Sequence, residues 1–322
     1  MKKTFYTALA ELQARPLPPE FETISGPLPH SLLNDLMFRI VFESDQNGLK
    51  HLLCSLLHYK PEQIAEIEIK NPIRLGKCVD DKKYIYDIYL LLNNKEKIHL
   101  ELQVLHQDYW TERSLCYLCR EFGTINAGDT YDQVKHLIQI DILDFDLYEG
   151  TQEFYSTYHL ANDKTGRIFS DKLCLHVLEL NKDEYATEED KAYNIDYWAR
   201  LFKATTWEEL KMLAKEQETL QSTIETIYRV NADDYVRAEL EAREDELRVQ
   251  RTLDNEMKRR LEKLAEQQQT IAEQQNKIAV QQNKIDVQQN TIVAQQNTID
   301  TQQNTIAELQ AEIAQLKALE AK

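Results

Sequence analysis

The sequence predicts an α/β head with a mixed β-sheet flanked by helices, followed by a helical connector and a long coiled coil. Helical and strand-like segments alternate in residues 1–185, which is typical of a sheet covered by helices. Apolar residues at helical spacing continue through residues 186–256. In residues 257–322, isoleucine recurs every seventh residue from Ile271 to Ile313, which is the signature of a left-handed coiled coil.

The composition indicates a folded protein of an ordinary kind. Hydrophobic residues make up 42% of the chain, and there are only seven glycines and seven prolines, which excludes a collagen-like or disordered chain. No run of about 18 apolar residues occurs, so we expect no membrane-spanning helix. The five cysteines are odd in number and scattered among apolar neighbours, which favours reduced thiols in the cytoplasm over a disulfide framework.

The net charge is an argument against a polyanionic partner. The whole chain has a formal charge of −17, and residues 1–190 hold 20 Lys and Arg against 32 Asp and Glu, a balance of −12. Phosphate backbones are bound through basic surface. Any nucleic-acid binding must therefore depend on local basic groups or on bound cations.

The elements of the head follow one another in a recognisable order. Two helical segments come first, SLLNDLMFRIVFES and NGLKHLLCSLLHY. Four short segments rich in β-branched and aromatic residues follow: YIYDIYLLL, KIHLELQVL, VKHLIQIDILDF and DKLCLHVLEL. The segment WTERSLCYLCREF between the second and third of them has helical spacing. This order predicts a mixed sheet with helices packed on it.

Two of these predicted strands carry a carboxylate among bulky residues. The turn at Asn93–Glu96 is centred between residues 94 and 95 and places Asp87 opposite about residue 102, within one pair of Glu101. Gln103 shares the face of Glu101 because strand side chains alternate. The two carboxylates, the amide and the Leu102 carbonyl form a hard-oxygen set that suits Mg²⁺ or Mn²⁺. The alternative is an exposed hairpin whose acids face water, and spacing alone does not decide between the two.

The order of segments resembles the Rpn-type recombination-promoting nucleases and putative transposases of the PD-(D/E)XK superfamily. The resemblance covers about residues 30–250 and rests on NDLMFRIVF, on YDIYLLL with IHLELQ, on the stretch from RSLCYL to GDTYDQVKHLIQIDILDFDLY, and on NADDYVRAELEARE. It implies a restriction-endonuclease-like core in residues 1–185. It further implies a metal-dependent DNA endonuclease that promotes recombination or transposition-like events.

The resemblance also assigns roles to individual residues. Asp87 matches the aspartate of the family motif and Glu101 its acidic partner, which implies that both are metal ligands. Gln103 stands where many superfamily members have lysine. Asp35 matches an acidic position near the N-terminus of the family's sequences. Glutamine can orient a water molecule but contributes no charge, so more of the electrostatic stabilisation falls to the metal.

Other candidates have simpler explanations. Cys116 and Cys119 form a CxxC with no second pair, so we expect them in a helix core rather than on zinc. His99 shares the face of Glu101, and a packing role is the simpler explanation for it. Three basic side chains could contact phosphate but are as typical of a solvated surface: Arg113, Lys135 and His136.

The C-terminal part of the chain predicts a helix with a recognisable N-terminus and, after it, a coiled coil through which chains associate. Thr205 or Thr206 is a plausible N-cap before the helical segment WEELKMLAK. The heptads allow isoleucine at a or at d. Leu309 and Leu316 favour the register with isoleucine at a, in which glutamine takes most d positions and these leucines complete the d series. We expect two or more chains to associate through this seam. The alternative is a solvated, glutamine-rich, low-complexity segment.

Two hypotheses on function follow from these observations. The first is a nuclease head on an oligomerising stalk, which the set Asp87, Glu101 and Gln103 favours. The second is a catalytically inactive oligomeric scaffold or regulatory protein that retains the nuclease fold, which the acidity of the head favours.

Overall fold

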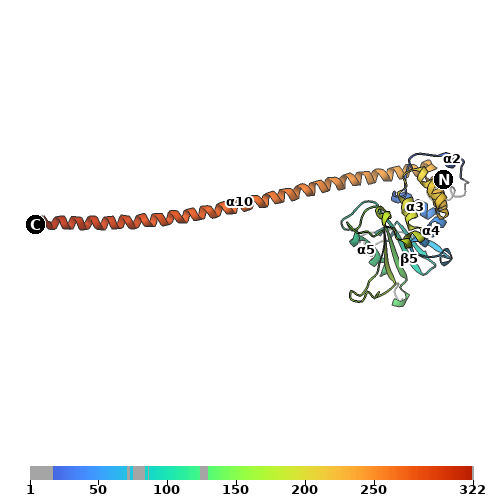
Figure 1. Cartoon of the computed structure of the whole chain (residues 1–322), viewed down its shortest axis with the longest axis horizontal. Coiled ribbons are helices and arrows are strands. Elements are labelled where there is room, and N and C mark those ends of the chain that lie inside the picture. Colours follow the sequence, from blue (N-terminus) through green and yellow to red (C-terminus); the bar gives the residue numbers. More distant parts are fainter. Residues whose placement is uncertain (1–16, 71–72, 75–83, 86, 124–129, 321–322) are drawn as a thin grey trace. The chain divides into compact units, whose positions relative to one another are not determined.

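The computed structural model describes residues 17–70, 73–74, 84–85, 87–123 and 130–320. The contacts within the chain divide it into two compact units, with the boundary in the sequence between Val249 and Gln250. Figure 1 shows the sheet and its helices, which belong to the first unit, and the long helix α10. The division of the chain at residues 185 and 256 stays a prediction.

The first unit is built around a mixed sheet of six strands, as the alternation of segments predicts. The strand order is β1-β4-β5-β6-β8-β7. The β4–β5, β1–β4 and β7–β8 pairs are antiparallel, whereas β5–β6 and β6–β8 are parallel. The short edge strands β1 and β7 are additions to the four predicted strands. The strands are β1 (Ile67–Lys70), β4 (Ile88–Leu92), β5 (Glu96–Gln103), β6 (His136–Leu143), β7 (Tyr155–Tyr158) and β8 (Leu173–Glu179), with β2 (Ile73–Arg74) and β3 (Tyr84–Ile85) in a separate ribbon.

Helices cover the sheet and form the rest of the unit. The α-helices are α2 (Glu20–Thr23), α3 (Asp35–Ser44), α4 (Gln46–Leu56), α5 (Trp110–Phe122), α6 (Glu188–Ala192), α7 (Ile195–Lys203), α8 (Trp207–Glu216), α9 (Gln221–Ala232) and α10 (Asp234–Glu320). Within the described residues, 3-10 turns lie at Pro61–Gln63, Tyr131–Gln133, Leu180–Tyr185 and Glu218–Leu220. The predicted cap before WEELKMLAK is confirmed, because the Thr206 side chain accepts a hydrogen bond from the backbone of Glu209 in a capping box.

The two faces of the sheet differ in chemistry. On one face, alternate residues of β4, β5 and β6, among them Leu90, Leu100 and Ile140, join the main hydrophobic core with α3, α4, α7 and α9. On the other face, β5 and β6 present polar side chains toward α5, with buried Glu101 and Asp141 in the same register. Figure 1 shows α5 on the side of the sheet away from α3 and α4. Strand alternation therefore separates an apolar core from a polar layer.

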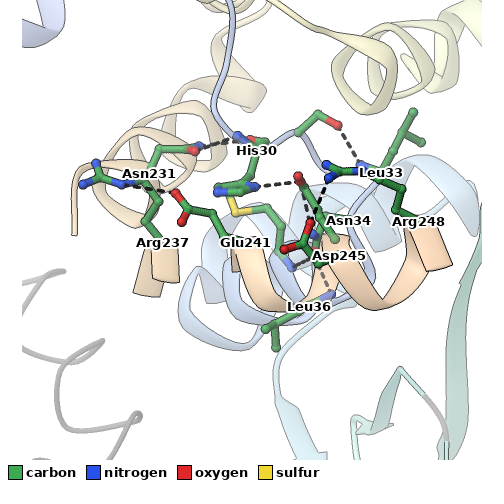
Figure 2. Close-up of polar contacts among 12 residues, drawn as sticks. His30, Leu33, Asn34, Leu36, Asn231, Arg237, Glu241, Asp245 and Arg248 are labelled. Atoms are coloured by element: carbon green, nitrogen blue, oxygen red, sulfur yellow. Dashed lines mark hydrogen bonds and ion pairs between the residues drawn. The ribbon is translucent and has the colours of Figure 1, made fainter. Parts of the chain in front are cut away.

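The end of α9 and the start of α10 hold the segment that leads into α3. The Asn231 side chain donates to the carbonyl and accepts from the amide of buried His30, at 3.1 and 3.0 Å, as Figure 2 shows. The His30 ring contacts Glu244 of α10 at 2.7 Å. Asn34 caps α3 by accepting from Leu36 and Met37. These contacts fix the position of Asp35, the first residue of α3.

The second unit is the continuation of α10. No helix in the described residues is both long and apolar enough to cross a membrane. The isoleucines at the a positions are exposed in the single chain, from 45% for Ile299 to 63% for Ile278. The predicted long helix is confirmed, and association through its apolar row stays a prediction.

Candidate active site

The hairpin between β4 and β5 brings Asp87 and Glu101 together. Asn93 and Asn94 adopt positive φ angles of 50° and 57°, which asparagine tolerates better than most residues. The β4–β5 register pairs Ile88 with Leu100, and the next step along both strands places Asp87 opposite Glu101. The prediction of residue 102 was off by one position, because three turn residues separate the pair Leu92 and Glu96 rather than two.

The Asp87 carboxylate contacts the neighbouring strand directly. Its Oδ2 accepts a hydrogen bond of 2.8 Å from the Leu102 amide. Amide and carbonyl of one strand residue point to the same side, so the Leu102 carbonyl is directed toward the side of Asp87. Burial raises the pKa of Asp87 to about 7. The negative charge of Asp35 adds to this increase, whereas the bond from Leu102 and the cations Arg39 and Arg113 oppose it.

The Glu101 carboxylate is buried and only half satisfied. The residue is 3% exposed, and its Oε1 accepts a bond of 2.9 Å from Nη2 of Arg113. Its Oε2 is buried and has no hydrogen-bond partner among the described residues. Burial raises the pKa of Glu101 well above its ordinary value, and the charge of Asp87 raises it further, whereas Arg113 and the backbone amide of Asp87 oppose the increase. An unpartnered carboxylate oxygen in such surroundings costs free energy unless a cation or a proton compensates it.

The other predicted residues lie at the margin of this pair. Asp35 begins α3 and accepts from the amide of Leu36 at 2.9 Å, and its charge is felt at Asp87. Gln103 ends β5 on the face of Glu101, and its Nε2 donates to the Leu105 carbonyl at 2.6 Å. That bond fixes the amide group and leaves its carbonyl oxygen as the acceptor available for a water molecule.

The sequence reasoning overlooked a third acid beside Asp87 and Glu101. Asp141 pairs with Glu101 across β5 and β6 and is 1% exposed. Its carboxylate accepts from Ser114 at 2.6 Å and from Gln139 at 2.9 Å. Burial raises the pKa of Asp141 to about 6, against the effect of these bonds. The signal was present in IQIDIL, where polar residues alternate with isoleucine as they do in IHLELQ.

Arg113 has a defined place in the site. It was only one of three candidate phosphate contacts in the sequence, and it is the ion-pair partner of Glu101. The other two bind elsewhere: Lys135 donates to Asn94 at 2.9 Å, and His136 contacts Glu96 at 3.4 Å.

His99 and the CxxC are not ligands of this site. His99 is 1% exposed and packs edge to face on Tyr89 at 4.8 Å, as a packing role predicts. The expectation that Cys116 and Cys119 lie in the core was wrong, because both are exposed. Helix α5 buries the side that carries Ser114, Tyr117 and Leu118 instead.

The oxygen groups at the hairpin fit a divalent cation of the Mg²⁺ type. Two carboxylates that repel each other, one with an unpartnered buried oxygen, gain from a cation between them. Among the described residues, no group of three or more His, Cys, Asp or Glu side chains has the arrangement of a metal site. The ligand set would therefore combine the two carboxylates with the backbone carbonyl of Leu102 and with water, as Mg²⁺ sites commonly do.

Comparison with known proteins agrees with this geometry. The model of the PD-(D/E)XK nuclease family transposases matches residues 32–258, which include every element of the hairpin site. Among curated proteins and among solved structures, none matches the chain. The match extends over more than half of the 322 residues. The chain therefore belongs to the PD-(D/E)XK nuclease family transposases.

Proposed function

We propose that the protein is a divalent-metal-dependent DNA endonuclease that hydrolyses phosphodiester bonds. The observation that supports this most is the pair Asp87 and Glu101, opposite each other on one hairpin of a PD-(D/E)XK family chain, with raised pKa values and an unpartnered oxygen on Glu101. Raised carboxyl pKa values that have a definite charged neighbour are typical of functional sites.

Each residue of the site has a definite task in this proposal. Asp87, Glu101 and the Leu102 carbonyl would hold Mg²⁺ or Mn²⁺, which when bound polarises the phosphodiester and lowers the pKa of a water ligand. Gln103, with its Nε2 held by Leu105, accepts a hydrogen bond from the attacking water and orients it. Asp35, a neighbour of Asp87, is a less direct participant and adjusts the charge of the site.

Plasmid nicking tests the proposal against an inactive scaffold. We expect the full chain to relax supercoiled DNA with Mg²⁺ or Mn²⁺ and not with EDTA. Glu101→Gln should abolish nicking in a protein that elutes and melts as a folded species. If the purified wild type leaves the plasmid intact with either metal, the inactive-scaffold hypothesis is favoured. The ion pair between Arg113 and Glu101 would then only neutralise a buried carboxylate and have no role in catalysis.

We further propose that two or more copies of the chain associate through α10. The supporting feature is the row of exposed isoleucines seven residues apart from Ile271 to Ile313, because near-identical heptads complement a second copy of themselves. Paired heads could act on both strands or on neighbouring DNA segments, which suits a role in recombination or transposition-like events. The cytoplasmic location stays a prediction from the cysteine content.

Truncation after Arg251 tests this association. The shortened protein should scatter light as a smaller species and bind DNA more weakly, because linked sites gain affinity from their proximity. A matched control replaces exposed Gln side chains on the outer face of the helix and leaves the isoleucine row intact. A full-length protein that sediments as a monomer at micromolar concentration would contradict association.

A further inference from the structure

Arg113 is held at the edge of the site by aromatic rings. Its guanidinium carbon lies 5.1 Å from the centre of the Trp110 ring and 5.2 Å from that of Tyr117, one turn of α5 before and after it. Such contacts orient the plane of the group. The side chain is 27% exposed, whereas that of Glu101 is 5% exposed, so Arg113 lies between the buried carboxylate and solvent.

The hydrogen bonds that Arg113 makes to the described residues leave part of its donor capacity unused. Nη2 donates to Glu101 at 2.9 Å, and Nη1 donates to Gln107 at 3.3 Å. A further bond joins it to the Tyr117 hydroxyl. A guanidinium has five N–H donors in a planar fork that matches two oxygens of a phosphate. Arg113 can therefore bind an anion without first leaving the site.

The charge balance of the site depends on Arg113. Its guanidinium contacts Glu101 at 2.9 Å, and Glu101 lies opposite Asp87 on one neighbouring strand and pairs with Asp141 on the other. Three acids on one face would repel a phosphate. Gln103, at the end of the same strand, has no charge with which to compensate them.

We propose that Arg113 binds the scissile DNA phosphate in this site and supplies the positive charge that Gln103 lacks. This inference rests on the proposed nuclease function. It assigns to α5 a task that the resemblance gives to a lysine on the strand. The bond to Glu101 holds the guanidinium ready, and a cation at Glu101 frees Nη2 for a phosphate oxygen.

A purely structural Arg113 would behave differently toward metal. If the side chain only holds Glu101 in place, its removal disturbs the carboxylate and weakens metal binding. If it is a phosphate ligand, its removal takes away a cation that competes for Oε1 of Glu101, so metal affinity is kept or increased. Metal affinity and DNA affinity then change in opposite directions.

The experiment compares three full-length variants with the wild type. Arg113→Gln removes the charge and keeps much of the size, and Arg113→Lys keeps the charge and loses the fork. Arg200→Gln is the matched control, because Arg200 likewise pairs with a glutamate at 3.1 Å and lies 5.1 Å from a tyrosine ring, far along the chain on α7. Three quantities are measured: Mg²⁺ affinity by calorimetry, duplex affinity in Ca²⁺ across a salt series, and plasmid cleavage in Mg²⁺.

Arg113→Gln should bind Mg²⁺ at least as tightly as wild type. The slope of its log affinity for DNA against log salt should fall by about 0.9, the value for one phosphate contact. Its cleavage rate should fall about a hundredfold, as for the loss of one hydrogen-bond donor to the charge of a transition state. Arg113→Lys should retain the salt slope and cleave at an intermediate rate, and Arg200→Gln should match wild type. The proposal is overturned if Arg113→Gln keeps the wild-type salt slope, or if it loses Mg²⁺ binding.

The salt series also separates this inference from the proposed function. A wild type that does not cleave, but whose salt slope falls in Arg113→Gln, would refute the nuclease and leave the phosphate contact standing. A wild type that cleaves, with an unchanged slope and rate in Arg113→Gln, would refute the contact alone. If Arg113→Gln does not fold, Arg113→Lys decides: a reduced cleavage rate with a retained salt slope supports the contact, and a wild-type cleavage rate would overturn binding of the phosphate by the guanidinium fork.

Discussion

Leu100 and Glu101 are adjacent in β5, yet their side chains lie on opposite faces of the sheet, one in an apolar core and the other in a polar layer. Leu100 is fully buried in the main core, where packing alone satisfies it. Glu101 is almost as deeply buried on the opposite face, where Arg113 satisfies one oxygen and the other has no partner in the described part of the chain. The apolar face contributes stability, whereas the polar face costs stability in return for a reactive arrangement.

The largest expected effect separates the two faces by substitution. Glu101→Gln should reduce Mg²⁺-dependent cleavage by about a thousandfold or more, because it removes a charged ligand, and should leave the protein folded. Leu100→Ala should cost about 2–5 kcal/mol of unfolding free energy and leave cleavage per folded molecule close to wild type. Urea unfolding and nicking rates measure both. Near-wild-type nicking by folded Glu101→Gln would refute the assignment of catalysis to the polar face.

The next effect concerns the amide at the end of β5. Gln103→Ala should slow cleavage by about tenfold, because orienting a water molecule is worth less than ligating the metal. Gln103→Lys should preserve activity, since it restores the charge common in the superfamily. Single-turnover rates at saturating Mg²⁺ check both variants. A loss in Gln103→Ala as large as that in Glu101→Gln would mean that Gln103 acts directly on the metal or the phosphate.

The pH dependence of stability should show the cost of the polar face. The pKa of Asp87 is raised to about 7 in the folded state, from 3.8, so the folded protein binds more protons between these values. The contribution of Asp87 to the free energy of unfolding is therefore full below about pH 4 and is lost as the pH rises through 7. Without metal, Asp87→Asn should melt higher than wild type at pH 8 and equally at pH 4. Scanning calorimetry in EDTA measures this, and equal melting at pH 8 would contradict it.

The apolar face of the sheet should give a smaller pH dependence of stability, with the opposite sign. His176 lies on the core side, bonded to Tyr155 and Cys174 at 2.7 and 3.1 Å. Burial lowers its pKa from 6.5 to about 4, so the unfolded chain binds more protons between these values. Stability is then lost as the pH falls from 6.5 toward 4. His176→Gln should flatten the melting temperature in this range, and an unchanged pH profile would refute the assignment.

The sequence predicted the hairpin and its acids well because both depend on local rules. Strand alternation places Glu101 and Gln103 on one face, and a short polar turn sets the register to within one residue. The role of Arg113 depends on how α5 is rotated about its axis against the sheet, which tertiary packing decides. The same rotation leaves Cys116 and Cys119 exposed, and helical spacing alone could not show which side of α5 is buried.

Titration calorimetry with Mg²⁺ is the most direct test of a metal ion on the polar face. We predict that the wild type binds Mg²⁺ at pH 8 and that Glu101→Gln does not. Glu121→Gln is the control, because Glu121 is also a buried acid on this side of the sheet but is satisfied by Lys97 and Tyr89 at 3.1 and 3.0 Å. It should bind Mg²⁺ as the wild type does. Equal Mg²⁺ binding by the wild type and Glu101→Gln would contradict the account.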